Sequence, residues 1–585
     1  MAGETFTNAL IVEADGRPLP ADIAVRLVAG YVDDSSTVPD MFLLRFRDPD
    51  HTVLSSTGIS IGSPVKLYAK AGDHPVQELL LAGEVTALEG EMDAGGTFTV
   101  VRGLDHSHRL FRGRRVASYK QMTVSDIAVA VANRAGLRIG RVDPTTEVLD
   151  QVIQPNITDW EFIRTLAEEV GAEVVVLQEQ FQFRMPAQAA HAPGVSTPVE
   201  QSPFVLEKGR NLLTCRAAVT SVDQVQQIEV RGWDVKDKRA VVGRAQAQTT
   251  EAFSLGMAPG DVVRPFGDST FVTTDTPYTT QNQVDAAAQA LAATVAGSFA
   301  ELEAVAMGNP QLRAGKPVTL TEVGRPFEGK YTITGSRHVF DPAHGYQTWI
   351  TVKGAAESSL FGLTSGGGSL TRMPRVPGLV TATVSDTKDP DQQGRVKLCF
   401  PWLSPDYVSD WARTAQLGGK NGGGVFGAEV GDEVLVGFEQ GCLDRPYVVG
   451  GLYNGVDKPS SHETDLVDRT SGAVNRRAFV ARSGHAIEMF DCASGPKGVR
   501  VMTGDGKLKL DLDQKNTQIT VHSDGSVVIE AKQKVTVKAD QGVRVDAGSG
   551  ELELTGQSVS VTGRSGVRVD GGPSCSIQAS LVRIN

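Results

Sequence analysis

Over the last eighty residues of the chain, apolar side chains return in pairs at a nearly constant interval. The two members of a pair are separated by one position, and the first members step by 8, 8, 8, 9, 7 and 8 residues. Such a pair is typical of a short strand with two side chains on one face and polar ones on the other. Turn-forming residues, among them Gly525, Gly542, Gly556 and Gly566, lie between the pairs, and a repeat this short predicts a β-helix or β-prism. The pairs are Ile519 with Val521, Val527 with Ile529, Val535 with Val537, Val543 with Val545, Leu552 with Leu554, Val559 with Val561 and Val567 with Val569.

Burial is the physical problem that this repeat poses. One eight-residue unit offers two apolar side chains and no second layer to cover them. The simplest closure is three copies of the chain winding together around a triangular prism, so that the core lies between chains and all seven pairs are core residues. Burying them would yield on the order of 20–40 kcal/mol per chain, before the entropy of ordering the strands. The alternative is an ordinary β-sheet with coincidental spacing, and six steps within one residue of eight argue against it.

The first part of the chain reads as mainly β with a few helices. Residues 1 to about 115 carry short apolar runs that Gly, Pro and Asp separate, at a spacing typical of barrels. Thr158 and Glu161 form a capping box, and an apolar stripe that follows them ends at Gly171. Helices are expected at 125–135, 158–170 and Asn282–Val305. Strands are expected at 5–12, Ile23–Ala29, 42–47, 64–70, 79–88, 97–103, 172–177, 317–321, Lys330–His338 and 347–353, with further β structure over 205–270.

A Gly- and Ser-rich stretch, Leu363–Leu370, is the clearest domain boundary. After it come five expected strands in about 75 residues, which is the size of a small Greek-key barrel such as the OB-fold. These strands are 378–384, 394–400, 412–416, 433–439 and 446–450. Short strands at 486–489 and 499–502 are expected to connect the barrel to the repeat.

The barrel region carries four specific motifs, at Pro377–Val380, Gly394–Trp402, Gly431–Phe438 and Arg445–Asn454. These motifs resemble those of VgrG-type spike proteins of contractile injection systems. This family includes type VI secretion, extracellular phage-tail-like particles and the hub and spike of contractile phages. Upstream, 154–171 is similar to a helix of the family's hub domain, and His106–Arg115 to the loop before it. With the terminal repeat, the resemblance spans nearly the whole chain in the family's domain order.

The resemblance implies a mainly β homotrimer. A pseudo-sixfold hub would match a hexameric tube to a threefold spike, OB barrels would form a collar, and a three-stranded intermolecular β-helix would be the needle. The partners implied are tube and baseplate proteins at the hub, a PAAR-type protein at the tip, and effector cargo. The predicted domains are 1–362 (hub), 363–376 (linker), 377–455 (OB barrel), 456–506 (connector) and 507–585 (needle and tip).

The end of the chain is the expected seat of the tip protein. Cys575 with Ile577 and Val582 with Ile584 roughly continue the repeat, so Ile577, Leu581, Val582 and Ile584 are predicted to offer an apolar platform. A frayed terminus is the alternative. The one departure noted in the barrel, Gly441–Asp444, lacks the proline of a turn that relatives often carry. About 50 residues between barrel and needle leave no room for a lysozyme domain, and no toxin domain follows the needle, so a bare structural spike is expected.

Composition and charge narrow the partners. The net charge is −12, and three copies would carry −36, which argues against nucleic acid or an anionic membrane as an electrostatic partner. The five cysteines are scattered without a CxxC motif, so neither a disulfide framework nor a zinc site is expected. The start of the chain lacks the basic and apolar regions of a signal peptide. A protein made in the bacterial cytoplasm and built into a phage-tail-like particle is expected, with an extracellular particle favoured over type VI secretion.

No catalytic, cofactor-binding or metal-binding residue is predicted. Gly418–Gly424 lacks the Gly-Lys-Ser/Thr ending of a phosphate loop. His485, Asp491 and Cys492 lie on expected strand and turn without a nucleophile elbow, and the pair His106 and His108 has no third ligand. The basic cluster His106–Arg115 is interpreted as an edge that pairs with acidic neighbours, with a polyanion patch as the alternative.

Three functions are compatible with these patterns. The first is a structural spike whose needle breaches a target membrane mechanically when a sheath contracts. The second is a β-helix enzyme that degrades polysaccharides, but outward positions such as Thr536, Glu553 and Ser560 show no clustered carboxylates. The third is an adaptor whose hub or tip carries effectors for a type VI secretion system, and it is compatible with the first.

Overall fold

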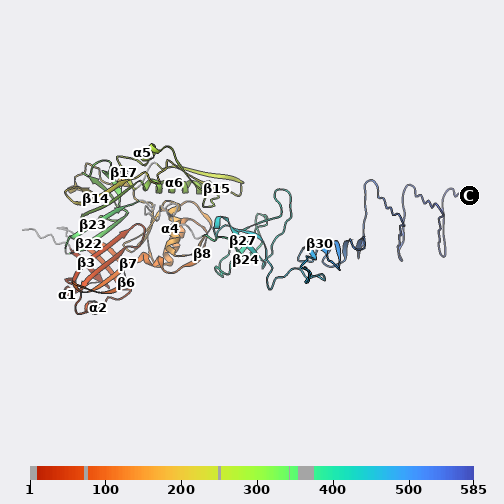
Figure 1. Cartoon of the computed structure of the whole chain (residues 1–585), viewed down its shortest axis with the longest axis horizontal. Helices are drawn as coiled ribbons and strands as arrows, with labels where there is room; N and C mark the ends of the chain where they lie inside the picture. Colours follow the sequence, from red (N-terminus) through yellow and green to blue (C-terminus); the bar gives the residue numbers. More distant parts are fainter. Residues whose placement is uncertain (1–8, 71–76, 248–251, 342, 354–374, 585) are drawn as a thin grey trace, which may run out of the picture. The chain divides into compact units, whose positions relative to one another are not determined.

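The computed structural model describes residues 9–70, 77–247, 252–341, 343–353 and 375–584. The chain separates into two compact units, Met1–Lys458 and Pro459–Asn585. The first holds the helices and most of the sheets, and the second holds one sheet and the repeat (Figure 1). The predicted linker Leu363–Leu370 lies outside the described residues.

The largest sheet of the first unit joins segments from both ends of the hub region. In the described part of the chain it has eleven strands, and β22 pairs with β3 although some 300 residues separate them. Alternation along β4 places Phe42, Leu44 and Phe46 in a core beneath the sheet, where all three are fully buried. The strands, in order across the sheet, are β14 (Leu212–Val219), β19 (Ala300–Met307), β23 (Gly345–Val352), β22 (Gly335–Asp341), β3 (Leu27–Ser35), β4 (Met41–Arg47), β7 (Gly96–Asp105), β6 (Glu78–Asp93), β5 (Pro64–Lys70), β1 (Ala9–Ala14) and β2 (Arg17–Pro18).

Two capped helices form the next core. In α4 (Asp159–Glu169) the Thr158 hydroxyl accepts from the Glu161 amide, and the Glu161 carboxylate accepts from the Thr158 amide at 2.9 Å, so the predicted capping box is present. α4 packs with α3 (Val124–Arg134) over a small sheet whose strand β12 contributes Phe181 and Phe183 to the core. The strands of this region are β8 (Arg115–Met122), β9 (Arg138–Val142), β10 (Leu149–Ile157), β11 (Glu173–Leu177) and β12 (Gln180–Arg184).

A long alanine-rich helix, α6 (Gln281–Gly297), lies against a separate three-stranded sheet. Val284, Ala288, Ala292 and Ala296 recur at helical spacing and pack on β15 and β16. The remaining elements of the hub are β13 (Val205–Glu207), β15 (Gln227–Asp234), β16 (Arg239–Gln246), β17 (Phe253–Leu255), β18 (Thr270–Thr273), β20 (Pro317–Thr321), β21 (Gly329–Thr332), α1 (Ala21–Ala24), α2 (Val53–Thr57), α5 (Pro259–Val263), η1 (His106–Phe111), η2 (Ala189–His191), η3 (Val199–Gln201) and η4 (Arg264–Phe266).

Three predicted elements are wrong in part. The helix expected over Asn282–Val305 ends at Gly297, and residues 300–307 form β19, because alternate residues there are buried in the large sheet and this packing overrides alanine's helix propensity. The strand expected over Ile23–Ala29 begins at Leu27, since Pro20 starts the short helix α1. The strand expected over Lys330–His338 divides into β21 and β22, which belong to different sheets.

The OB region has the five expected strands, in the order β25-β24-β27-β28-β26. Alternate residues of β24 and β27, such as Ala382, Val384, Val434 and Val436, fill its core together with Phe400. The elements are β24 (Leu379–Asp386), β25 (Lys397–Cys399), β26 (Arg413–Thr414), β27 (Glu433–Phe438), η5 (Glu439–Gly441) and β28 (Pro446–Gly451).

The sheet of the second unit is an antiparallel meander in which each strand pairs with the next along the chain. The first predicted pair of the repeat, Ile519 and Val521, lies in the last strand of this sheet. The strands are β29 (Arg476–Val480), β30 (Ala486–Asp491), β31 (Lys497–Met502), β32 (Leu508–Asp513) and β33 (Gln518–Ser523).

Candidate functional site

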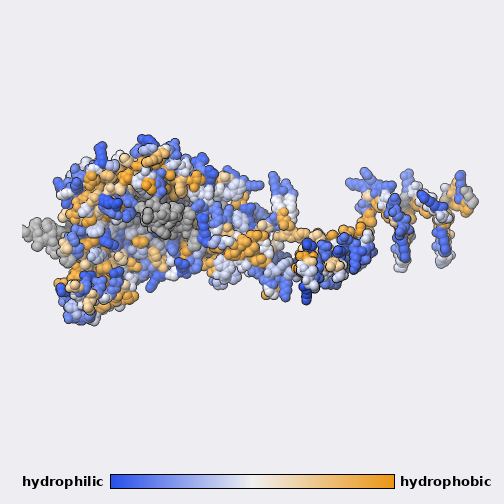
Figure 2. All heavy atoms as spheres, in the orientation of Figure 1, coloured by the Kyte–Doolittle hydropathy of each residue, from blue (hydrophilic) through white to orange (hydrophobic). Residues whose placement is uncertain are grey.

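The backbone after β33 keeps the eight-residue period of the apolar pairs. Bends or turns interrupt extended segments at a spacing of eight, with small shifts only around 548–550. Figure 1 shows this segment as an open trace that winds back and forth, and Figure 2 shows open space between its successive passes. The bends fall at 524–525, 532–533, 540–541, 548–550, 556–557, 564–565 and 572–573.

The residues predicted to form the needle core are all exposed in the single chain, so one copy on its own does not bury them. Ile519 and Val521, in β33, are 71% and 64% exposed. After β33, the exposed fractions of the first members of the pairs are 57% for Val527, 53% for Val535, 56% for Val543, 56% for Leu552, 58% for Val559 and 57% for Val567. Those of the second members are 75% for Ile529, 75% for Val537, 68% for Val545, 67% for Leu554, 71% for Val561 and 75% for Val569.

The physical reason for this exposure is the lack of a second layer. Between 524 and 584 the described chain makes no strand pairing, so nothing in the same chain covers these side chains. In every pair after β33 the second member is more exposed than the first, which gives the repeat a regular apolar edge. An apolar surface of this extent indicates an interaction site.

The uncovered apolar surface also crosses the sheet before the repeat. Phe479, Ile487, Val501, Leu510 and Val521 are partners in register on five successive strands, and each is at least 39% exposed. The side chains of directly opposed residues point to the same face of an antiparallel sheet. This row ends in β33, immediately before the first bend, so the sheet and the repeat present similar apolar surfaces one after the other.

The predicted tip residues are exposed as well. Ile577, Leu581, Val582 and Ile584 are 76%, 67%, 48% and 91% exposed. They lie in extended chain on either side of a bend at Ser580. All four side chains are therefore accessible for contact in the single chain.

The residues considered for catalysis do not form a reactive set. Cys492 is buried with its Sγ 3.9 Å from the Asn475 carbonyl oxygen, whereas His485 accepts a hydrogen bond from the Gly504 amide through Nδ1. In the described residues, no group of three His, Cys, Asp or Glu side chains is arranged to hold a metal ion. No helix within the described ranges combines the length and hydropathy that a bilayer span requires.

The basic cluster is paired with an acidic neighbour, as predicted. His108 Nε2 lies 2.8 Å from Glu84 Oε2, and Arg109 makes an ion pair with the other oxygen of the same carboxylate. Burial would raise the pKa of Glu84, but the hydrogen bonds with Arg109 and His108 lower it to about 2. Glu84 therefore neutralises part of this cluster, as expected for an edge that pairs with acidic neighbours.

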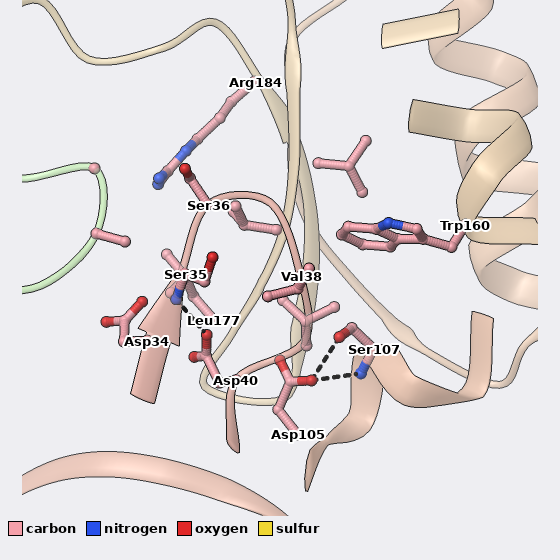
Figure 3. Close-up of a pocket in the computed structure, with 15 residues that line it drawn as sticks. Asp34, Ser35, Ser36, Val38, Asp40, Asp105, Ser107, Trp160, Leu177 and Arg184 are labelled. Atoms are coloured by element: carbon pink, nitrogen blue, oxygen red, sulfur yellow. Dashed lines mark hydrogen bonds between the residues drawn. The ribbon is translucent and has the colours of Figure 1, made fainter. Parts of the chain in front are cut away.

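One polar cluster of the hub was missed in the sequence. Arg313 Nε donates to Asp34 Oδ2 at 2.6 Å, and Arg313 Nη2 lies 3.8 Å from Asp40 Oδ2. Asp105 accepts from the Ser107 amide and hydroxyl at 3.0 and 2.5 Å (Figure 3). Burial raises the pKa of Asp105 to about 7, and burial with repulsion from Asp34 and Asp105 raises the pKa of Asp40 well above its usual range.

This acidic cluster lines two cavities. The smaller, of about 10 Å³, is closed on one side by Trp160 of α4 (Figure 3), and the larger, of about 250 Å³, lies between β6, β11 and the segment 313–316. The cluster joins residues up to 279 positions apart, so no local motif reveals it. The one local signal is two consecutive aspartates in β3, because alternation along a strand must turn one of them inward.

Comparison with known proteins supports the barrel motifs. Residues 380–453 match the type VI secretion system/phage-baseplate injector OB domain, and residues 56–341 match the Alg8 N-terminal domain. The type VI secretion system spike protein VgrG5 of Pseudomonas aeruginosa is 33% identical over 187 residues, which is 30% of this chain and 21% of VgrG5. The resemblance to VgrG-type spike proteins is confirmed. VgrG1c of the same organism is 39% identical over 93 residues, 14% of this chain and 13% of VgrG1c.

The matches to these VgrG proteins are partial. The chain spans about a fifth or less of the length of the two curated relatives named above. Among solved structures, a chain of a PdpA–VgrG complex in its lidless form superposes with a TM-score of 0.51 at 6% identity, over 89% of this chain and all of that one. The mainly β fold with an OB barrel is therefore VgrG-like.

Proposed function

We propose that the chain is the central spike of a contractile injection system, in which a hub on a hexameric tube continues into a threefold needle. Its likeness to VgrG spike proteins and its injector OB domain support this role. The observation that carries it furthest is the eight-residue repeat, which makes no strand pairing between 524 and 584 and leaves both members of every apolar pair more than half exposed.

In this proposal, three copies wind together and their repeats cover one another. The needle core is then made of the seven pairs, from Ile519 and Val521 to Val567 and Val569, and the open space between successive passes receives the other two chains (Figure 2). Parallel pairing between chains satisfies the backbone groups that the single chain leaves without strand partners. A rod with few free strand edges is suited to mechanical piercing of a membrane.

The remaining domains have connecting roles in this proposal. The hub region 1–362 contacts tube and baseplate proteins, and the OB barrel 377–455 forms a collar above the needle. Ile577, Leu581, Val582 and Ile584 seat a PAAR-type tip protein, and effectors travel with hub or tip. The protein binds no cofactor or metal and catalyses no reaction; the spike proteins among its relatives support this non-enzymatic role. It acts in a phage-tail-like particle that is released from the cell or delivers into another.

The test is the absolute mass of the purified protein by light scattering, beside a chain truncated after Lys458, where the first unit ends. Full-length protein is expected at three times 62.1 kDa, about 186 kDa. The truncated chain is expected to associate more weakly, because it lacks every apolar pair of the repeat. A stable full-length monomer would contradict the proposal and favour a repeat that closes on itself, as in a β-helix enzyme.

A further inference from the structure

At two positions of three consecutive eight-residue units of the repeat, the charged side chains alternate in sign. Counting each unit from its bend, the units 524–531, 532–539 and 540–547 have their first charges at Asp524, Lys532 and Asp540. All charges of the middle unit are basic. Its lysines at positions one and seven, Lys532 and Lys538, each correspond to an acidic residue at the same position of the unit before and of the unit after. At position seven the three units carry Glu530, Lys538 and Asp546.

Within the single chain these lysines are not neutralised. Among the described residues, neither Lys532 nor Lys538 makes an ion pair, although shorter-range pairs occur nearby, such as Arg544 with Asp546 at 2.5 Å. The extended segments of successive units do not pair with one another in this chain. In an assembly of several copies, ion-pair partners for the two lysines would therefore come from another copy.

The geometry of three wound chains fixes which units become neighbours. Suppose that each chain places successive units on successive faces of the prism. Threefold symmetry then places all three chains on every face. On any one face, a given unit of one chain lies beside the following unit of another chain. The two strands run parallel at about 4.8 Å, with equal positions side by side. Equal positions of successive units, contributed by different chains, are thus in contact.

We propose that Lys532 and Lys538 lie between acidic side chains of two neighbouring copies and so set the register of the trimer. Asp524 and Asp540 flank Lys532, and Glu530 and Asp546 flank Lys538. Pairing of identical units, the main alternative, would place lysine beside lysine, and like charges directly opposite one another destabilise a sheet. This inference rests on the proposed trimer and specifies its one-unit offset.

A third position agrees with the same offset. The residue between the two apolar members of a unit points outward, and at this position Arg544 is followed by Glu553 in the next unit. The offset brings these two opposite charges together as well. The glycine-rich turn at 548–550 accommodates the extra residue between them.

The first experiment is a charge reversal with a matched control. Lys532→Glu places like charges side by side in all three chains and is expected to speed dissociation of the trimer about tenfold. Arg564→Glu makes the same change in charge at the same position of another unit, where the neighbouring units carry Gly556 and Gly572, so it is expected to dissociate at the wild-type rate. Subunit exchange between fluorescently labelled trimers measures the rate.

A variant that restores the opposite charges, with their signs exchanged, completes this test. Adding Asp524→Lys and Asp540→Lys to Lys532→Glu is expected to return the exchange rate towards that of the wild type. Equal rates for Lys532→Glu and Arg564→Glu, or a triple variant as fast as the single one, would overturn the proposed register without affecting the trimer itself.

The second experiment identifies the contacts directly. Trimers assembled from ¹⁴N- and ¹⁵N-labelled chains are treated with a zero-length carbodiimide crosslinker and digested for mass spectrometry. Mixed-isotope peptides that join Lys532 to Asp524 or Asp540, and Lys538 to Glu530 or Asp546, are expected. Trimers whose crosslinks join other units, or only residues of one isotope, would overturn the inference, whereas a chain that stays monomeric would overturn the proposed function on which it rests.

Discussion

The hub and the repeat use the same sequence pattern and cover it in opposite ways. In β12 of the hub, Phe181 and Phe183 are two apolar residues separated by one position, and both are fully buried beneath α3 and α4. In the repeat, Val535 and Val537 have the same arrangement and are 53% and 75% exposed. The same strand pattern therefore produces an apolar face in both regions. In the hub, helices of the same chain cover that face, whereas in the repeat no element of the same chain does.

Because of this difference, the stability of the hub and that of the repeat are expected to depend differently on protein concentration. The hub closes its cores within one chain, so its folding does not depend on protein concentration. In the proposed trimer the repeat gains its burial by association, so its order would be linked to the concentration of chains by mass action. Changes to one region are therefore expected to leave the other largely intact.

The largest effect is expected from a charge inside the proposed needle core. Val537→Asp would place three carboxylates together in an apolar interior, and an unpaired buried charge costs several kcal/mol at each site. Loss of stable trimers in light scattering is expected, while hydrogen exchange in hub peptides stays at the wild-type level. Thr536→Asp, one position away on the outward face, is the control and is expected to remain trimeric. Normal trimers of Val537→Asp would contradict a core formed by these pairs.

A smaller effect, in the opposite region, is expected from Phe181→Ala. Removing a fully buried phenylalanine typically costs about 3–5 kcal/mol, because a cavity remains beneath the helices. Faster hydrogen exchange in α4 and β12 is expected, with the trimer mass unchanged. Gln182→Ala, on the other face of β12, serves as the control. Loss of trimers in Phe181→Ala with an unperturbed α4 would show that the two regions are not independent.

The same contrast explains how much the sequence could predict. The Thr158 capping box is a local pattern and is present where it was expected. The backbone after β33 keeps the eight-residue period of the apolar pairs, but the short strands predicted there are not formed in the single chain. Ala300–Met307 looked helical, because alanine-rich sequence is ambiguous until the neighbouring strands β14 and β23 are known. The cluster around Arg313 could not be predicted, since pairing of β22 with β3 brings distant segments together. What covers the repeat is absent from a single chain altogether.

The smallest expected effect is a pH dependence of the stability of the hub, which the repeat is not expected to share. Burial raises the pKa of Asp105 to about 7, above the value of about 3.9 in an unfolded chain. The folded hub therefore holds a proton that the unfolded chain releases, and this contribution to stability is complete below about pH 4 and lost as the pH rises through about 7. Asp40, with its pKa raised in the same direction, adds to the trend.

Asp105→Asn removes the ionisable group but keeps an oxygen that can accept from Ser107. The variant is expected to be more stable than the wild type by roughly 1–3 kcal/mol near pH 8, and the difference should shrink towards pH 4. Thermal unfolding of the hub at several pH values measures it, with the exposed Asp50→Asn as a control. At each pH the trimer should dissociate at the same rate in Asp105→Asn and in the wild type, because Asp105 lies in the hub and not in the repeat. An equal pH dependence in wild type and Asp105→Asn would assign the buried proton to another member of the cluster.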